Sequence, residues 1–592
     1  MSTLINLIYR LFTEKKACLK QILILNLLIL FISAAYSYGD DITNTLHNLS
    51  ISGPGTVKST VEAEVCIFCH APHKASKENP PLWNRSLSEA NYIPYQSTSI
   101  YANVGQPTGA SKLCLSCHDG TVALGAILSL SGERPFEGGL RFMPPGRTLI
   151  GTDLTDDHPV SFLFNSQLAI DNGQLFDPGT LPAEVRLDHN EMLQCTSCHN
   201  PHGTANPKFL VKSRSFSELC RSCHDKEGWG ITSHSTVSAT WNGAGTDPWP
   251  HTPFTTVDEN ACENCHDPHS AGSDERILNY FFEEDNCFTC HSGNVASTNI
   301  ETQFTKTYIH PVQDFVGIHS PAEDATTMQK HVECFDCHNP HWANSSNPPQ
   351  GAPEVSGRNQ GVTGIDESGQ PVDEALNLYE ICYKCHGDNN VKTVAPVNRQ
   401  YPEINVRLEF DPSNPSYHPV EAIGANPDVP SLTGGLTENS IIYCTDCHNN
   451  NDLTGPRGPH GSTNHFLLER RYDHGGFADF NQARFALCFK CHSYNNLSDD
   501  RSFEHDRHLD KDKKCYMCHD PHGISSTQGN SVNNAHLINF NLDYVQPRGF
   551  AEPMYEMIGD PSEHRGRCNL RCHGENHGSS SGDSWRSYNC PC

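Results

Sequence analysis

The sequence has 592 residues, of which only 36% are hydrophobic, and it contains 27 cysteines and 34 histidines. Its formal charge of −28 repels nucleic acid and so excludes that class of partner. Glycine and proline are plentiful, at 44 and 39 residues, and no sustained helical or strand periodicity follows residue 40, which argues against a conventional aliphatic core.

The first 39 residues have the features of a secretory signal peptide. Basic residues precede an apolar run from 22 to 35, and small residues follow it. An uncleaved membrane anchor is the alternative, but a run this short, interrupted by Asn26, does not cross a bilayer comfortably. We expect an exported chain with no membrane span once residues 1–39 are removed. We also expect no lipid anchor, because Cys18 precedes the apolar run.

Beyond the signal peptide, pairs of cysteines two residues apart recur along the chain, and each pair is followed at once by histidine. Chance does not produce eleven such CxxCH motifs in this composition. Disulfide frameworks and zinc ribbons, the alternatives, need no histidine after every pair, whereas attachment of haem c does. One helical turn places both thiols on one face, where they add to the haem vinyl groups, and brings the histidine beneath the iron as proximal ligand. The motifs are Cys66, Cys69 and His70; Cys114, Cys117 and His118; Cys195, Cys198 and His199; Cys220, Cys223 and His224; Cys262, Cys265 and His266; Cys287, Cys290 and His291; Cys334, Cys337 and His338; Cys382, Cys385 and His386; Cys444, Cys447 and His448; Cys488, Cys491 and His492; and Cys515, Cys518 and His519.

The last motif is irregular, because three residues separate Cys568 from Cys572. Cys572 and His573 keep the usual spacing, so we expect a twelfth haem c attached through both cysteines with His573 as proximal ligand. A disulfide to Cys590 or Cys592 is the alternative, since neither of these cysteines has a histidine after it. The sequence leaves the role of Cys590 and Cys592 open.

Further histidines recur at two places relative to the motifs, and we predict that they are the sixth, distal ligands of the irons. Five motifs continue as CHxPH, and a sixth has an insertion before its Gly-Pro-His. The proline ends the haem-binding turn, so the next histidine projects away from its own haem and can bind a neighbouring iron. A second set lies upstream, in a threefold His-Pro-Val repeat and in comparable places where His234 and His505 compete. The predicted distal ligands are His73, His202, His269, His341, His460 and His522 from the first set and His47, His158, His251, His310, His418 and His508 from the second.

Methionine is the alternative distal ligand and raises the reduction potential. Only six methionines follow residue 39, so we expect mostly bis-histidine, low-spin, low-potential haems. The motifs group into six tandem units of two haems each, which indicates an array. The units span residues 40–140, 141–240, 241–300, 301–400, 401–500 and 501–592.

Twelve haems in a chain of this length leave too little protein for an independent core around each one, so the haems themselves must form the core. We therefore predict a mostly irregular fold with short α-helices and little β-sheet, wrapped around a haem stack, and no folded form without haem. Two spacers without cysteine or histidine, residues 119–157 and 343–374, are predicted to be surface loops.

The pattern resembles the doubled-CxxCH family of multihaem c-type cytochromes over nearly the whole mature chain, for example at residues 66–73 and 195–202. The resemblance implies closely packed bis-histidine haems. Some similar secreted cytochromes, which act in extracellular electron transfer, polymerise into filaments in which one subunit lends a histidine to a haem of the next. His47 is a candidate for such a role. The insertion before His460 and the spacing at Cys568 depart from the family pattern and put those two ligand sets in doubt.

Conduction of electrons along a row of haems is the leading interpretation. We expect other redox proteins or extracellular acceptors as partners, and the chain could also assemble into a homopolymer. The alternative is a multihaem oxyanion reductase, which needs one iron with an open coordination site, often marked by a proximal lysine. Here histidine follows every CxxC and enough histidines remain to close every site, so we expect no catalytic residues. A structural or adhesive surface protein would not require so many ligands. We expect a location outside the cell or at its surface, with the periplasm as the alternative.

Overall fold

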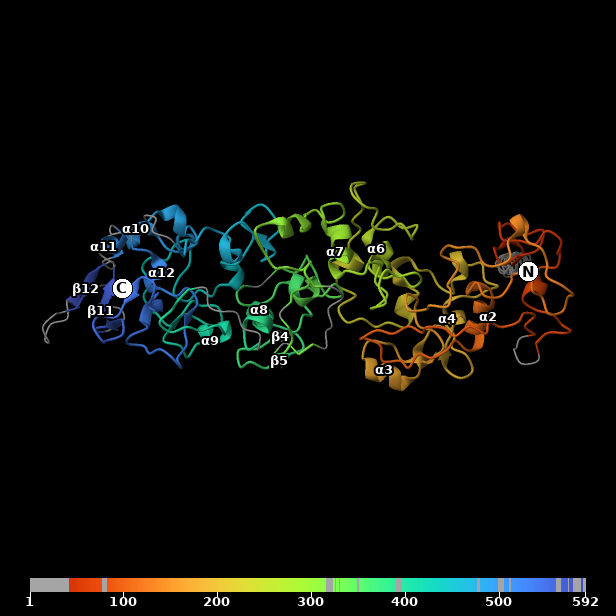
Figure 1. Cartoon of the computed structure of the whole chain (residues 1–592), viewed down its shortest axis with the longest axis horizontal. Coiled ribbons are helices and arrows are strands. Elements are labelled where there is room, and N and C mark those ends of the chain that lie inside the picture. Colours follow the sequence, from red (N-terminus) through yellow and green to blue (C-terminus); the bar gives the residue numbers. More distant parts are fainter. Residues whose placement is uncertain are drawn as a thin grey trace, which may run out of the picture. The chain divides into compact units, whose positions relative to one another are not determined.

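The structure is a computed structural model (Figure 1), and it describes residues 42–76, 82–315, 323–324, 326–329, 331–348, 351–389, 397–475, 480–498, 505–509, 513–559, 566–572, 574–578 and 587–588. The chain forms two compact units. The first runs to Tyr95 and includes Tyr101–Arg214 and Glu218–Cys223; the second holds Gln96–Ile100, Ser215–Ser217 and the chain from His224 onward. The predicted signal peptide lies outside the described residues, as do His573, Cys590 and Cys592. The division into six haem units stays a prediction.

Most helices are short and many are built around the CxxCH motifs. Each of the eleven regular motifs forms a helical turn, as predicted, and in most of them the histidine amide donates to the carbonyl of the first cysteine, for example His70 to Cys66 at 2.8 Å. The α-helices are α2 (Gly109–His118), α3 (Ser166–Asn172), α4 (Cys195–Cys198), α5 (Ser233–Thr236), α6 (Val257–Asn260), α7 (Glu283–His291), α8 (Leu378–His386), α9 (Val406–Phe410), α10 (Tyr494–Leu497), α11 (His505–Leu509) and α12 (Cys515–Cys518). Six motifs are 3-10 turns, at Cys66–Phe68, Cys220–Ser222, Ala261–Asn264, Cys334–Asp336, Cys444–Asp446 and Cys488–Lys490.

The strands are also short, and several join segments that are distant in sequence. β3 (Tyr308–Ile309) pairs with β7 (Gly461–Ser462), and β6 (Ser416–Tyr417) pairs with β8 (Gly523–Ile524), both antiparallel. The remaining pairs are β1 (Phe162–Leu163) with β2 (Met192–Leu193) and β4 (Gly364–Ile365) with β5 (Pro371–Val372). Near the C-terminus, β11 (Gly566–Cys572) pairs with β9 (Val545–Gln546), β10 (Met554–Met557), β12 (Glu575–His577) and β13 (Ser587–Tyr588).

Two glycines begin strands directly after a predicted distal histidine, Gly461 after His460 and Gly523 after His522. A Cβ atom on Gly461 would lie 2.0 Å from the Gln303 carbonyl oxygen, and one on Gly523 would lie 2.1 Å from that of Glu409. Only glycine therefore lets the neighbouring backbone approach each histidine this closely.

The apolar core is divided into small clusters. Among the described residues, no cluster has more than five buried members and the longest helix has ten residues. One cluster joins Tyr383 of α8 to Phe410 of α9, and another packs Phe68 against Phe136. The fold is mostly irregular with short helices and little sheet, as predicted. Across the described residues, no helix combines the length and the apolar character that crossing a bilayer requires.

The prediction that both spacers are surface loops was wrong in part. In residues 119–157, Leu124 and Phe136 are buried against the first CxxCH turn. In residues 343–374, the β4–β5 hairpin buries Ile365 beside Tyr383. The reason is that the apolar side chains needed to cover the haem-binding turns come from segments without ligands, so the absence of cysteine and histidine does not indicate exposure.

Candidate haem sites

Pairs of histidine rings face each other at a nearly constant separation. The ring centres are separated by 6.3 Å in His47 and His118, 6.1 Å in His70 and His202, 6.2 Å in His234 and His291, 6.4 Å in His266 and His341, 6.4 Å in His310 and His386, 6.1 Å in His338 and His460, 6.2 Å in His448 and His522, and 6.0 Å in His505 and His519. Two metal–nitrogen bonds of about 2.0 Å, with half an imidazole ring on each side, give about the same separation. One histidine of every pair belongs to a CxxCH motif, so the residues fit a haem iron held between two imidazoles.

Many of the paired histidines are in the protonation state that binds metal, whereas burial of His522 is outweighed by Glu409, which raises the pKa of that ring. Burial lowers the pKa of His266 and His448 to about 4 and that of His460 to about 3. Such rings are neutral at pH 7 and need not lose a proton before they coordinate iron.

Hydrogen bonds from Nδ1 orient the proximal rings. Nδ1 of His266 donates to the Arg276 carbonyl at 2.8 Å, and Nδ1 of His448 donates to the Phe466 carbonyl at 2.8 Å. In the same way, Nδ1 of four other proximal histidines bonds to a backbone carbonyl: His199 to that of Lys208, His519 to that of His536, His118 to that of Thr148 and His338 to that of Arg358. A proton on Nδ1 leaves Nε2 as the nitrogen that can bind iron.

Four of these acceptor carbonyls belong to unusual turns. Each is on the first of two consecutive residues with positive φ, in the pairs Lys208 and Phe209, Arg276 and Ile277, Phe466 and Leu467, and His536 and Leu537. Left-handed backbone costs such residues about 1 kcal/mol or more each. Its recurrence at four equivalent places indicates that the turn is kept to aim the carbonyl at the proximal histidine.

A second set of hydrogen bonds joins the distal histidines to one another. Nδ1 of an upstream histidine donates to the carbonyl of the proline that precedes a CHxPH-type histidine. The bonds run from His47 to Pro201, from His234 to Pro340, from His310 to Pro459 and from His418 to Pro521. The proline of the motif therefore has a second role besides ending the haem-binding turn, because its carbonyl fixes the ring that serves the adjacent haem.

The pairing follows a regular register. The proximal histidine of the first motif in a unit faces the CHxPH-type histidine of the following unit, as His338 faces His460. The proximal histidine of the second motif faces an upstream histidine, as His386 faces His310. This register holds for the first motifs that contain His70, His266, His338 and His448. His519, in the first motif of the last unit, instead faces the upstream His505.

Some predicted ligands are placed differently from expectation. The ring facing His291 is His234, whereas Nε2 of His251 lies 3.3 Å from the Glu263 carbonyl oxygen. The ring facing His519 is that of His505, which lies one helical turn before His508 on α11. The sequence offers His234 and His505 only as competitors for these two places.

The other predicted distal ligands fall into four groups. His47, the candidate for lending to another subunit, faces His118 of its own chain. His418 is half-buried near His492, whose pKa is lowered to about 4 by burial and further by His418. His158 and His269 are half-buried. His73 is exposed and makes no hydrogen bond, ion pair or ring contact with the residues that the structure describes.

Contacts between cysteines give the spatial order of the motifs. Within a predicted dihaem unit, the second cysteines of the two motifs approach each other, as Cys265 and Cys290 do. Burial has the largest effect on the pKa of the Cys265 thiol, and together with the nearby Cys290 thiol it raises that pKa to about 12. Between units the first cysteines hydrogen bond, in the pairs Cys114 and Cys195, Cys287 and Cys334, Cys382 and Cys444, and Cys488 and Cys515. Within each compact unit, motifs adjacent in sequence are therefore adjacent in space.

The irregular motif has a different backbone. Cys568 and Cys572 lie on β11, where they pack beside Cys518 against a cluster that includes Leu570. In extended chain, the four steps from Cys568 to Cys572 separate the two α-carbons by roughly 13 Å. The helical turn of the other eleven motifs is therefore absent here. Strand pairing on both sides of β11 accounts for this extended conformation. The twelfth haem stays a prediction.

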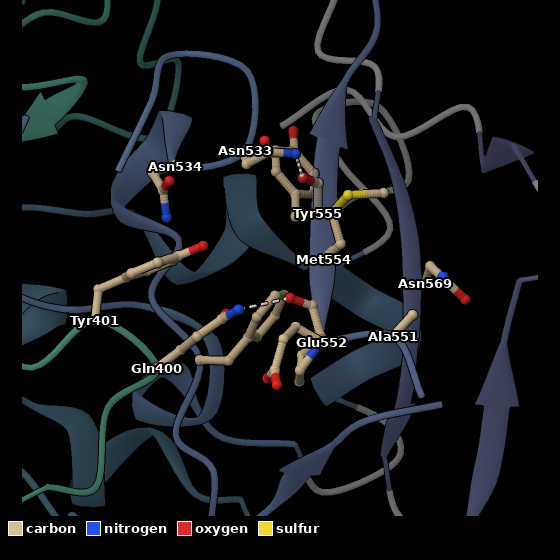
Figure 2. A pocket seen from close by; sticks show the side chains of 11 residues that line it. Gln400, Tyr401, Asn533, Asn534, Ala551, Glu552, Met554, Tyr555 and Asn569 are labelled. Carbon is tan, nitrogen blue, oxygen red and sulfur yellow. Dashed lines mark hydrogen bonds between the residues drawn. The ribbon is translucent and has the colours of Figure 1, made fainter. Parts of the chain in front are cut away.

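A cavity of about 230 Å³ lies beside β10 and β11 (Figure 2). Gln400 donates to the Pro553 carbonyl and Asn533 to that of Tyr555 across its lining. The lining contains no histidine or cysteine, and the volume is below the roughly 300 Å³ of a usual small-molecule site. This cavity therefore gives no support to a catalytic haem.

Comparison with known proteins agrees with the motif geometry. A family model described as the doubled CXXCH motif matches residues 189–228, 251–296 and 436–496. The chain is also similar to multiheme cytochrome MtrA of Shewanella baltica (strain OS185), with 23% identity over 210 residues, which cover 33% of this chain and 43% of MtrA. The alignment thus spans less than half of that relative. These matches and the paired imidazoles show that the chain is similar to the multihaem c-type cytochromes with doubled CxxCH motifs.

Proposed function

We propose that the protein conducts electrons along a row of bis-histidine haems that follow one another in sequence order. The observation that carries the proposal is the set of eight histidine pairs at 6.0 to 6.4 Å, each of which could hold one haem iron between its two rings. Bound haem supplies the one-electron redox chemistry. The chain supplies the attachment cysteines, the axial rings and the contacts that keep neighbouring motifs together.

The distal ligands follow from the ring pairs. In this proposal the eight distal ligands are His47, His202, His234, His310, His341, His460, His505 and His522. His418 serves the motif of His492, on the evidence of its burial beside that ring. The predicted signal peptide and the acidic composition support export and a role in extracellular electron transfer.

Electron paramagnetic resonance of the fully oxidised, full-length protein tests the proposal. We expect essentially all iron to be low-spin, because two imidazoles bind each iron. His341→Ala should convert one haem to high-spin, whereas His189→Ala, which changes an exposed histidine outside the pairs, should change nothing. A high-spin haem in the unaltered protein that shifts on addition of nitrite would instead support the reductase.

We further propose that His73 binds a haem of a second copy of the chain. In the register, a histidine in the CHxPH position faces a proximal histidine of a different unit, and His73 stands in that position. His73 is exposed and has no partner within the described part of the chain, so its ring is available to a neighbouring molecule. A homopolymer with haems in continuous order would result.

The size of the secreted protein tests this second proposal. We expect elongated particles by electron microscopy for the unaltered chain and for His189→Ala. His73→Ala should give single molecules with the haem content per chain unchanged. Polymers that survive this substitution would remove His73 from the interface, and single molecules in every sample would rule out the homopolymer.

A further inference from the structure

The second ring nitrogens of the axial histidines have different partners. Most of the described Nδ1 hydrogen bonds end on neutral oxygens, such as the carbonyl partners of the proximal rings and the Ser431 hydroxyl that lies 2.8 Å from His492. His522 differs, because its Nδ1 lies 2.9 Å from a carboxylate oxygen of Glu409. Glu409 is only 5% exposed, so little water screens this contact.

The fold holds Glu409 in place from several sides. Glu409 lies on α9, and Asn414 donates to its carbonyl and to that of Leu408. Gly523 permits the close approach of α9 to β8, and the Phe410 ring packs 5.3 Å from that of His522. The carboxylate is therefore built into the surroundings of His522.

The other charges nearby largely balance. Asp520 lies with Glu409 and His522 in a group whose ligand atoms are all within 4.8 Å of one another. Arg399 is 3.4 Å from Asp520, and Asn539 also donates to that carboxylate. Asp520 is thus neutralised by its own partners, which leaves Glu409 as the acceptor for the imidazole proton.

We propose that Glu409 holds the reduction potential of the haem carried by Cys444 and Cys447 below that of its neighbours. The inference rests on the proposed function, in which His522 is the distal ligand of that haem. A carboxylate that accepts the Nδ1 proton makes the imidazole a more basic ligand. A more basic ligand stabilises ferric over ferrous iron and so lowers the potential. Glu409 is a positioning residue, since it acts only through His522.

The haem between His338 and His460 provides an internal comparison. His460 occupies the same place after its proline as His522 does, and both residues are half-buried. Its Nδ1, however, has no hydrogen-bond partner among the described residues. The two haems therefore differ in the hydrogen bond of the distal ring, and the haem of His460 should have the higher potential.

Spectroelectrochemical titration of the full-length holoprotein tests the proposal with Glu409→Gln. We expect one haem to leave the low-potential end of the curve, with its reduction equilibrium constant raised about tenfold, or 59 mV for one electron. The haem content by mass and the low-spin count should stay unchanged.

Glu421→Gln is the matched control, because Glu421 is a partly buried carboxyl that bonds to the Tyr383 hydroxyl at 2.5 Å. An equal shift in both variants would show a general effect of charge and overturn the proposal, as would no shift in Glu409→Gln. Glu409→Asp, which keeps the charge, should restore the low potential; if it instead matches Glu409→Gln, the carboxylate is only structural. His522→Ala separates failure of this proposal from failure of the proposed function. If His522 is not a distal ligand, that variant leaves every haem low-spin.

Discussion

Produced without haem attachment, the chain is expected to have no cooperatively folded state. The described core consists of clusters of at most five buried residues, and the cysteines and histidines between them are placed to surround haem. Ten residues is the length of the longest described helix, which is marginal in isolation. Without the cofactor these elements have no common surface to pack against, so binding and folding are one process.

Circular dichroism and hydrogen exchange test this expectation. The sample is the chain produced in the cytoplasm, where haem is not attached, with its cysteines kept reduced. We expect little fixed structure, full exchange of backbone amides and no sigmoidal thermal transition. The control is the same chain exported and loaded with haem, which should protect amides at the CxxCH turns. A cooperative transition in the haem-free chain would show that the protein clusters suffice for folding.

The parts that the sequence predicts well are those fixed by covalent chemistry. Two thiols and a proximal histidine must meet one porphyrin, so the CxxCH spacing dictates a helical turn wherever it occurs. The irregular spacing at Cys568 removes that constraint, and strand pairing determines the backbone instead. The short helices and scarce sheet follow from the small share of apolar residues.

Distal pairing was harder to predict, because several distal rings are held by hydrogen bonds to proline carbonyls a hundred or more residues away. His234 has no His-Pro-Val sequence, and its position is set by the distant Pro340 carbonyl. His505 and His508 share one face of α11, so periodicity cannot choose between them. One signal was present in the sequence: His251 and His508, the two upstream histidines whose place facing a proximal ring is taken by another histidine, lie closer to the next motif than the histidines of the His-Pro-Val repeat lie to theirs.

Loss of one interior haem is expected to reduce conduction through the molecule by orders of magnitude. Cys334→Ser combined with Cys337→Ser removes the attachment site of a motif that stands between Cys287 and Cys382 in the order given by the cysteine contacts. The gap then spans the width of a haem, and electron transfer falls steeply with distance. Current through a monolayer contacted at both faces measures the effect, with haem content checked by intact mass.

The matched control is Cys66→Ser combined with Cys69→Ser, which also removes one haem but from the first motif of the chain. Conduction should persist there, because the neighbouring motif at Cys117 remains to make the end contact. His460→Met offers a variant that keeps all haems yet raises one potential, so its loss of current should be smaller. A linear row fails at any interior break, whereas a branched array passes current around it. Equal currents in the interior and terminal double variants would therefore show that the haems are connected by more than the sequence-order contacts.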